Sequence, residues 1–406
     1  MTAPKCTVGD LALFGGAPTF GEILHVGRPN LGDRARLMTR IDDILDRRWL
    51  TNDGRYVQEL EGELQRRLGV KHCIATCNAT IGLELAVRAL ELRGEVIVPS
   101  LTFVATAHVL QWQGITPVFC DVSPHTLTLD PERVEELVSP RTTGILAVHL
   151  WGRPADVDAL VEIAERRRLG LLFDAAHAFA CTTRRRMIGG FGDAEVFSFH
   201  ATKFFNTFEG GAIATNDDGL ARTLRLMRNF GFSDYDSVVS LGTNAKMSEV
   251  AAAMGLTGLE SLDDFIAVNR RNYDAYRHGL EGVRGVEVLG YDEKEENNYQ
   301  YVVLEIDREI AGIGRDDVMK VLWAENVRAR RYFYPGCHRM EPYRSIRPGD
   351  GERLPVTERV LDRVLTLPTG TALGYDEVLR TCELIRFVVG HGSEIHRRLD
   401  RTGGAR

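Results

Sequence analysis

Residues 170–216 read GLLFDAAHAFACTTRRRMIGGFGDAEVFSFHATKFFNTFEGGAIATN, and this stretch decides the fold class. Its short apolar runs GLLF, EVFSF and GAIAT are bounded by glycine and polar residues, which is typical of strands buried on both faces. Similar runs precede it and alternate with amphipathic helical stretches such as 156–168. They are HCIATC (72–77), EVIVPS (95–100), TPVFCDV (116–122) and GILAVHL (144–150). This alternation predicts an α/β fold, with a mostly parallel central sheet covered by helices.

The C-terminal part of the chain has a different pattern. Apolar residues at helical spacing predict helices over 220–230, 247–262 and 263–280. Beyond them the sequence predicts a strand at 298–306, a helix at 316–325, a strand-like segment at 328–334, a last helix at 376–399 and a frayed tail at 400–406. We therefore expect an N-terminal segment (1–35), a large domain (36–265) and a smaller α+β domain (266–406).

Composition excludes several classes of protein. The 406 residues, 44% of them hydrophobic, suffice for two cores, and the net charge of -7 without any long run of Lys and Arg argues against nucleic acid as a partner. The seven cysteines are scattered without a CxxC pair, so neither a disulfide framework nor a zinc ribbon is indicated. No segment reads as a signal peptide or a membrane span, so we expect a cytoplasmic protein with no membrane partner.

Polar segments follow three of the apolar runs, and open α/β sheets bind their ligands at such strand ends. In the first, the backbone N–H groups of Asn78, Ala79 and Thr80 begin a predicted helix and so could bind an anion. An ordinary helix cap by Asn78 explains the same residues. In the second, Asp174 ends a buried run, where a carboxylate needs a cationic partner. That partner is either a protonated pyridine nitrogen or an arginine elsewhere in the chain.

The third segment, FSFHATK, contains Ser198 and Lys203. A lysine at the end of a buried strand can stay partly unprotonated, form an imine with a cofactor and move a proton. Ser198 could add a hydroxyl to a phosphate site. His177, in the second segment, could hydrogen-bond the phenolic oxygen of the cofactor, or be a structural histidine.

Two further segments belong with these three: 26–54 (VGRPNLGDRARLMTRIDDILDRRWLTNDG) and 332–343 (YFYPGCHRMEPY). Together the five segments resemble the sugar aminotransferases of the DegT/DnrJ/EryC1/StrS family. The members of this family are fold type I enzymes that depend on pyridoxal 5'-phosphate. The resemblance implies that Lys203 carries the cofactor as a Schiff base, that Asp174 pairs with the pyridinium, and that His177 lies near the phenolic oxygen. Ser198 and the backbone of 78–80 would bind the phosphate. Phe103 would lie over the ring, and Asn244 would reach the phosphate from the neighbouring subunit of a homodimer.

The sequence departs from the family pattern at two places, where His177 replaces a glutamine and CNAT replaces a Ser-Gly-Thr triplet. Histidine can make the same hydrogen bond, and backbone amides do not depend on side chains. The motifs WLTNDG, FDAAHAF, FHATKF and YPGCHRMEPY are most similar to those of 4-aminotransferases acting on TDP-4-keto-6-deoxyglucose. The implied reaction takes an amino group from L-glutamate, stores it as pyridoxamine 5'-phosphate, and transfers it to the keto sugar.

Donors to the diphosphate and hydroxyls of a TDP-sugar are expected in two further segments. The candidates are Thr51, Asn52, Arg331, Tyr332, Tyr334 and His338, next to Arg330. A turn with a helix cap explains 51–54 equally well, and a strand with arginines and tyrosines is often a solvated face.

Other functions fit the sequence less well. The retained Lys203 favours transamination over the dehydration of relatives that carry histidine there, whereas a 3-keto sugar or a cyclitol ketone stays open as substrate. A nicotinamide oxidoreductase would need a GxGxxG turn between a strand and a helix, which this chain lacks. His149, His177 and His200 lie on separate runs without metal-ligand spacing, so no metal site is predicted.

Overall fold

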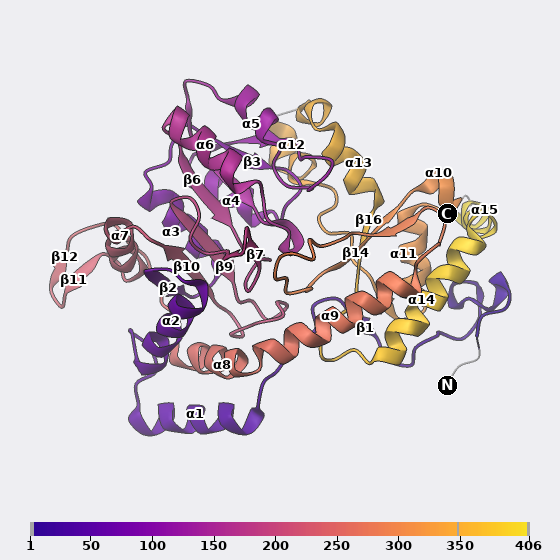
Figure 1. Cartoon of the computed structure of the whole chain (residues 1–406), viewed down its shortest axis with the longest axis horizontal. Coiled ribbons are helices and arrows are strands. Elements are labelled where there is room, and N and C mark those ends of the chain that lie inside the picture. The colour runs from indigo at the N-terminus through magenta and orange to yellow at the C-terminus, as the bar shows by residue number, and fades with distance from the viewer. Residues whose placement is uncertain (1–3, 347–348, 404–406) are drawn as a thin grey trace.

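The computed structural model describes residues 4–346 and 349–403, and its centre is a seven-stranded sheet (Figure 1). The strand order is β2-β10-β9-β6-β5-β3-β4. The bounds are β2 His72–Thr76, β3 Glu95–Pro99, β4 Thr116–Cys120, β5 Thr142–Val148, β6 Gly170–Asp174, β9 Ala194–Ser198 and β10 Gly211–Thr215. All pairs are parallel except those of β10, which runs antiparallel to β2 and β9. Each apolar run of the sequence is a strand of this sheet, which confirms the predicted fold class.

Side chains alternate between the two faces of the sheet and meet helices on both. On β6, Phe173 belongs to one hydrophobic cluster and Leu172 to another. The first face is covered by α1 (Arg34–Arg47), α2 (Arg55–Leu68), α5 (Pro131–Leu137), α6 (Val157–Arg167) and α8 (Glu249–Glu260). The second is covered by α3 (Ala79–Ala89), α4 (Ala105–Trp112) and α7 (Asp218–Arg228). Both faces of the sheet are therefore buried under helices, as is usual for a parallel sheet.

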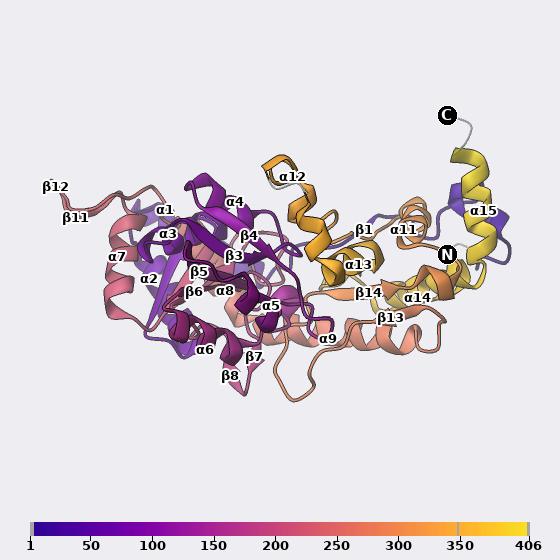
Figure 2. The same ribbon diagram turned by 90° about the horizontal axis from the view of Figure 1, so that it is seen from above.

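A second core occupies the C-terminal end of the molecule (Figure 2). Its strands β13 (Val286–Val288), β14 (Val302–Ile306) and β16 (Val364–Leu367) form an antiparallel sheet. Its helices are α10 (Arg308–Ala311), α11 (Arg315–Ala324), α14 (Tyr375–Gly390) and α15 (Gly392–Gly403). Two further helices pack elsewhere: α12 (Tyr343–Ile346) joins the cluster on the second face of the large sheet, and α13 (Pro355–Arg363) joins a separate cluster between the two cores. Among the described residues no helix is long and apolar enough to cross a membrane.

The helix α9 (Leu262–Gly279) connects the two cores. Its first turns place Leu262 and Phe265 in the core of the large sheet, and its last turns place Tyr273 and Tyr276 in the C-terminal core. This packing supports a domain boundary inside α9, although the exact division at 265/266 stays a prediction.

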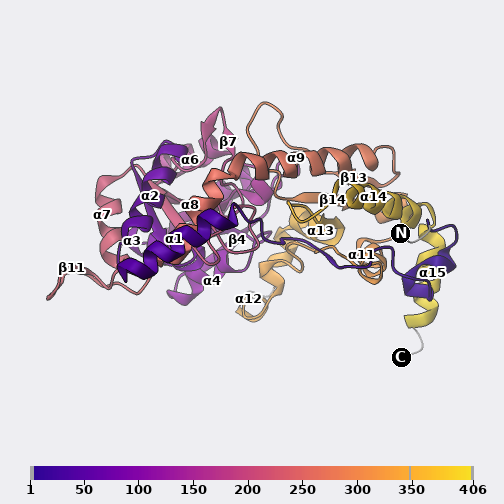
Figure 3. The ribbon, with the colours of Figure 1, turned by 90° about the horizontal axis from the view of Figure 1, so that it is seen from below.

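The N-terminal segment packs against the C-terminal core. Val8, Leu11 and Phe20 lie in that core, and β1 (Leu24–His25) pairs in parallel with β15 (Val327–Arg328). Figure 3 shows the segment running from this end of the molecule to α1 on the large domain.

Two short hairpins were not predicted. They are β7 (Thr182–Thr183) with β8 (Arg186–Met187), and β11 (Phe232–Asp234) with β12 (Ser237–Val238). The β11–β12 hairpin projects from the end of the molecule opposite the C-terminal core (Figures 1 and 2), and Tyr235 at its tip is 96% exposed.

The predicted helices 156–168, 220–230, 247–262, 263–280 and 316–325 are confirmed to within two residues at each end. Four other predictions are wrong in part. The strand predicted at 298–306 starts only at Val302, because the Asn298 amide is turned inward and donates to the carbonyls of His177 and Phe179.

The segment predicted as a strand at 328–334 leaves the sheet after Arg328. The predicted last helix is two helices with a break at His391, and 400–403 belong to α15 rather than to a frayed tail. The rest of the predicted tail, 404–406, lies outside the described residues.

Candidate active site

A cavity of about 600 Å³ opens where three parallel strands end. Val148, Asp174 and Ser198 are the last residues of β5, β6 and β9, and all three line it. The cavity also meets the start of α3 and the loop after β9. Of the residues predicted from the sequence, it brings together Asn78, Ala79, Thr80, Phe103, Asp174, His177, Ser198, Lys203 and Tyr332.

Lys203 lies half-buried in the loop after β9. Its backbone N–H donates to the carbonyl of His200 at 2.8 Å, and its Nζ donates to the hydroxyl of Tyr301 at 3.4 Å. Burial lowers the pKa of this amine from 10.5 to about 8, and the nearby carboxylate of Asp174 opposes part of that effect. Near neutral pH a useful fraction of the amine is therefore unprotonated and able to act as a nucleophile or base.

Asp174 is buried beneath the cavity and held by neutral donors. Thr106 Oγ1 donates to one carboxylate oxygen at 2.8 Å and the Ala176 N–H to the other at 3.1 Å. Burial raises the pKa of Asp174 above its ordinary value, while these hydrogen bonds and the charge of Lys203 lower it. No arginine within the described ranges pairs with this carboxylate, so the alternative of an internal salt bridge finds no support. A cation entering the cavity would complete its environment.

The structure defines which nitrogen of His177 can donate. The ring is buried, and its Nδ1 accepts a hydrogen bond from the backbone N–H of Trp151 at 3.2 Å. Burial, with the charge of Lys203, lowers the pKa of His177 well below 6.5, so the ring is neutral. The proton must then be on Nε2. The ring stacks on Phe333, with 5.6 Å between the ring centroids and nearly parallel planes, and this packing fixes its orientation. His177 therefore offers one donor, as a glutamine would.

The start of α3 has the features of a phosphate site. Asn78 caps the helix, because its Oδ1 accepts from the Ile81 N–H at 2.9 Å. The first N–H groups of a helix have no partner within it, which leaves those of Ala79 and Thr80 for a ligand. Opposite them, a Cβ at Gly211 would lie 2.8 Å from the Ala79 nitrogen and 2.7 Å from the Phe197 carbonyl oxygen. Only glycine lets β10 approach the helix start so closely.

This donor set fits pyridoxal 5'-phosphate. It provides amide donors and the Ser198 hydroxyl for a phosphate, a neutral donor for a phenolic oxygen, a carboxylate for a ring nitrogen, and a primary amine of lowered pKa. Phe103 also borders the cavity, 6.2 Å from the ring of Phe333.

Asn244 does not line this cavity. It is exposed at the base of the β11–β12 hairpin, where its Oδ1 accepts from Lys246 Nζ at 2.7 Å. Its position does not test the prediction that it serves a neighbouring subunit, which stays a prediction.

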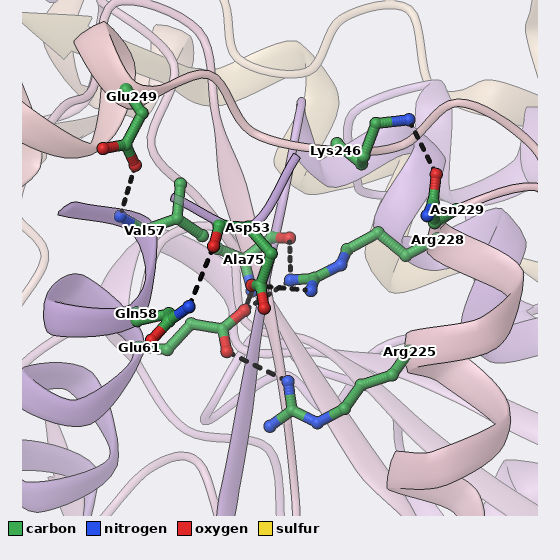
Figure 4. Close-up of polar contacts among 10 residues, drawn as sticks. All are labelled: Asp53, Val57, Gln58, Glu61, Ala75, Arg225, Arg228, Asn229, Lys246 and Glu249. Carbon is green, nitrogen blue, oxygen red and sulfur yellow. Dashed lines mark hydrogen bonds and ion pairs between the residues drawn. The ribbon is translucent and has the colours of Figure 1, made fainter. Parts of the chain in front are cut away.

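Thr51 and Asn52 also lie outside the cavity, in the exposed loop before α2. Asn52 lines a separate open pocket of about 740 Å³. Figure 4 shows the ion network beside that pocket, in which the buried carboxylate of Glu61 accepts from Arg225, Arg228 and the Ala75 N–H.

The other candidates for sugar-nucleotide binding are divided between two environments. Arg331 pairs with Asp316 at 3.1 Å and stacks on Tyr334, with 4.2 Å between the guanidinium carbon and the ring centroid. These two side chains line an adjoining pocket of about 500 Å³, which shares Tyr332 and Arg330 with the main cavity.

His338 lines neither pocket. It is buried with Nδ1 2.6 Å from Ser100 Oγ and Nε2 2.5 Å from Glu358. The substrate roles of all these residues stay predictions.

The sequence analysis missed several residues of the site. Tyr301 contacts the amine of Lys203, and Thr106 holds Asp174 while its Oγ1 lies 2.9 Å from that of Thr102. Tyr301 directly precedes β14, in a tyrosine-rich segment, and packs in a cluster with Val148 and Trp151 of the large domain, but nothing local indicates that it reaches the lysine. The backbone N–H of Trp151 cannot be assigned from sequence, because every residue except proline carries one.

Comparison with known proteins agrees with this geometry. The model of the DegT/DnrJ/EryC1/StrS aminotransferase family matches residues 33–386. A dTDP-4-amino-4,6-dideoxy-D-glucose transaminase of Shigella dysenteriae is 37% identical over 87% of this chain and 95% of its own length. A GDP-perosamine synthase of Caulobacter vibrioides is 35% identical over 86% and 94%.

Solved structures show the same relationship. DesI, crystallised in the presence of its TDP-sugar product, superposes with a TM-score of 0.92 and 50% identity, covering 97% of this chain and 100% of DesI. DesV of S. venezuelae, in complex with a ketimine intermediate, gives a TM-score of 0.82 and 30% identity over 89% of this chain and 98% of DesV. The chain therefore belongs to the DegT/DnrJ/EryC1/StrS aminotransferase family.

Proposed function

We propose that this chain is a pyridoxal-phosphate-dependent aminotransferase that converts TDP-4-keto-6-deoxy-D-glucose and L-glutamate into TDP-4-amino-4,6-dideoxy-D-glucose and 2-oxoglutarate. The observation that carries the proposal is the amine of Lys203, half-buried in a cavity with the carboxylate of Asp174 and the neutral ring of His177. The names of the Shigella transaminase and of the DesI complex support the choice of a TDP-sugar.

The cofactor supplies an electron sink for the carbanion formed next to the reacting nitrogen. Asp174 would pair with its ring nitrogen, which keeps that nitrogen protonated and the sink effective. His177 would donate from Nε2 to the phenolic oxygen, while the start of α3 and Ser198 would bind the phosphate.

Lys203 provides the proton transfers. With a pKa of about 8, its amine can accept a proton from a substrate carbon near neutral pH and return it later. The hydroxyl of Tyr301, 3.4 Å from Nζ, restricts the positions of the amine between these steps. Because one lysine serves both the amino donor and the keto sugar, the two substrates must react in turn, and ping-pong kinetics are expected.

We also propose that the enzyme is a homodimer in which Asn244 reaches the phosphate site of the partner subunit. In support, large apolar side chains are exposed on and beside the β11–β12 hairpin: Phe230, Phe232, Tyr235, Val238, Val239 and Leu241. Apolar surface gathered on one projecting element marks an interaction surface. Mixing Lys203→Ala and Asn244→Ala variants tests this, because a hybrid dimer would contain one intact site. Recovery of activity above that of either variant is expected, and none would occur if each chain uses its own Asn244.

Product analysis tests the reaction. The purified protein with pyridoxal 5'-phosphate, L-glutamate and TDP-4-keto-6-deoxyglucose should form 2-oxoglutarate and an amino sugar in equal amounts, with nitrogen at C4 by NMR. The Lys203→Ala variant should form neither. No product from the 4-keto sugar, together with amination of the 3-keto isomer at C3, would instead support the 3-keto-sugar alternative.

A further inference from the structure

A second, narrow cavity shares walls with the candidate active site. Thr202, Tyr301 and Tyr332 line both, and Thr202 directly precedes Lys203. The second cavity has a volume of about 20 Å³, compared with about 600 Å³ for the first. About 10–15 Å³ on this scale holds one water molecule, so the space admits a small polar group and excludes a sugar ring.

Two unused donors line this narrow cavity. Arg28 is exposed, and no carboxylate within the described ranges pairs with it. Gln300 is 8% exposed; its Oε1 accepts from the Phe204 N–H at 3.0 Å, but no described residue offers its buried Nε2 an acceptor within hydrogen-bond distance. A buried donor without an acceptor is costly, and the structure thus lacks a group that accepts hydrogen bonds at this place.

The charge of the cavity indicates which group is missing. Arg28 carries a positive charge, and none of the described residues that line the cavity is an aspartate or a glutamate. The amide nitrogens of the two asparagines in the cavity wall already donate, that of Asn30 to the Phe204 carbonyl and that of Asn269 to the Asn298 carbonyl. Asn269 Oδ1 has no donor in the described part of the chain and would be bridged by water. One cation and one amide donor without a competing anion are suited to a carboxylate.

The segment that carries Arg28 is fastened to the lysine loop. Asn30 donates to the carbonyl of Phe204 at 2.9 Å and accepts from Asn206 at 2.9 Å. Gly27 has a φ of +75° and passes so close to Thr202 that a Cβ there would lie 3.0 Å from the Thr202 Cβ. The backbone on both sides of Arg28 is therefore fixed beside the residue that precedes Lys203.

We propose that Arg28 and Gln300 bind the side-chain carboxylate of a dicarboxylic amino donor, and the matching carboxylate of the 2-oxo acid formed from it. The inference rests on the proposed aminotransferase function and specifies its donor: an amino acid whose α carbon reacts at Lys203 while its distal carboxylate enters the narrow cavity. The keto sugar, too wide for that cavity, occupies only the larger one.

The first test measures the two half-reactions separately in the loaded enzyme, by the fall of the cofactor's visible band with an amino acid and its return with the keto sugar. Arg28→Gln should lower the second-order rate constant with L-glutamate about tenfold to a hundredfold, through weaker binding, because a charge-assisted pair is lost. Its rate with L-alanine and with the keto sugar should be unchanged.

Further variants sharpen this test. Arg28→Lys keeps the positive charge and should restore part of the lost rate with L-glutamate. Gln300→Glu keeps an acceptor for the Phe204 N–H but places a negative charge beside the ligand, so it should weaken glutamate binding. Arg34→Gln is the matched control, since this exposed arginine of the same segment does not line the cavity.

A second test does not depend on activity. Glutarate, which has the two carboxylates but no amino group, is titrated calorimetrically into wild type and Arg28→Gln. Binding at least tenfold weaker in the variant is expected. Equal glutarate binding, an equal loss with glutamate and alanine, or a loss confined to the sugar half-reaction would overturn the proposal. If wild type transfers no amino group at all, the proposed function fails, and the glutarate titration still decides whether the carboxylate site exists.

Discussion

The amine of Lys203 is expected to react with acylating reagents at a pH where ordinary lysines are almost inert. Burial in the cavity lowers its pKa from 10.5 to about 8. At pH 7 about one-tenth of this amine is then neutral, against about three in ten thousand for a lysine with the ordinary pKa. The neutral amine is the reactive form, so the ratio of about 300 is the expected gain in reactivity before steric access is considered.

The assay is trace labelling of the cofactor-free protein with acetic anhydride between pH 6 and 11, with the labelled peptides measured by mass spectrometry. The rate constant at Lys203, corrected for hydrolysis of the reagent, should rise with pH to a plateau with a midpoint near pH 8, and the exposed Lys71 is labelled in the same sample for comparison. The profile itself, rather than the absolute rate, gives the pKa, so limited access to the cavity does not affect the result.

The Asp174→Asn variant determines the sign of the neighbouring charge. The carboxylate of Asp174 raises the pKa of Lys203 and partly offsets burial. Its removal should therefore move the midpoint below that of wild type. A wild-type midpoint near 10.5, or an upward shift in Asp174→Asn, would refute the reasoning.

Four further predictions follow from contacts in and around the site. His177→Gln should keep activity within a few-fold, whereas His177→Leu should lower kcat/KM about tenfold or more, because only the first retains a donor; equal activities would show that no donor is needed. Gly211→Ala should weaken cofactor binding, followed by fluorescence titration, by about tenfold or more through its clash with the start of α3, whereas Gly62→Ala, with open space around it, should not. Glu61→Gln should lower the free energy of unfolding by about 3 kcal/mol, measured by urea denaturation at fixed protein concentration, because it removes the buried carboxylate that pairs with Arg228 and leaves this arginine with the exposed Asp53; the exposed Glu59→Gln should have little effect. His338→Phe should lower the melting temperature and leave the KM for the keto sugar unchanged, since both ring nitrogens are bound within the protein, whereas a raised KM at an unchanged melting temperature would favour a substrate contact.

The fold and the centre of the site could be predicted because both depend on local pattern. Short apolar runs alternate with amphipathic stretches, and a parallel sheet brings the ends of its strands to one edge. The positions of Asp174 and Ser198 at strand ends, and of Lys203 just beyond one, follow from that rule. The cap by Asn78 followed from local sequence in the same way.

The remainder depends on packing between distant segments, which leaves no local signal. Tyr301 reaches Lys203 from the segment just before β14, and Glu61 on α2 meets Arg225 and Arg228 on α7. The N-terminal residues pack against the far end of the chain because their apolar side chains complete a core built mostly from residues after 270. In the sequence, Arg28 is indistinguishable from an ordinary surface arginine. Only the structure shows the cavity that its segment forms against the loop that carries Lys203.

The most direct test of the central claim is to reduce the protein with borohydride in the presence of pyridoxal 5'-phosphate and to locate the attached cofactor by peptide mass spectrometry. We predict attachment at Lys203, and a visible band that falls with L-glutamate and returns with TDP-4-keto-6-deoxyglucose before reduction. Attachment at another lysine, or no band at all, would contradict the account; a band that responds to glutamate but not to the sugar would show that the keto substrate is a different one.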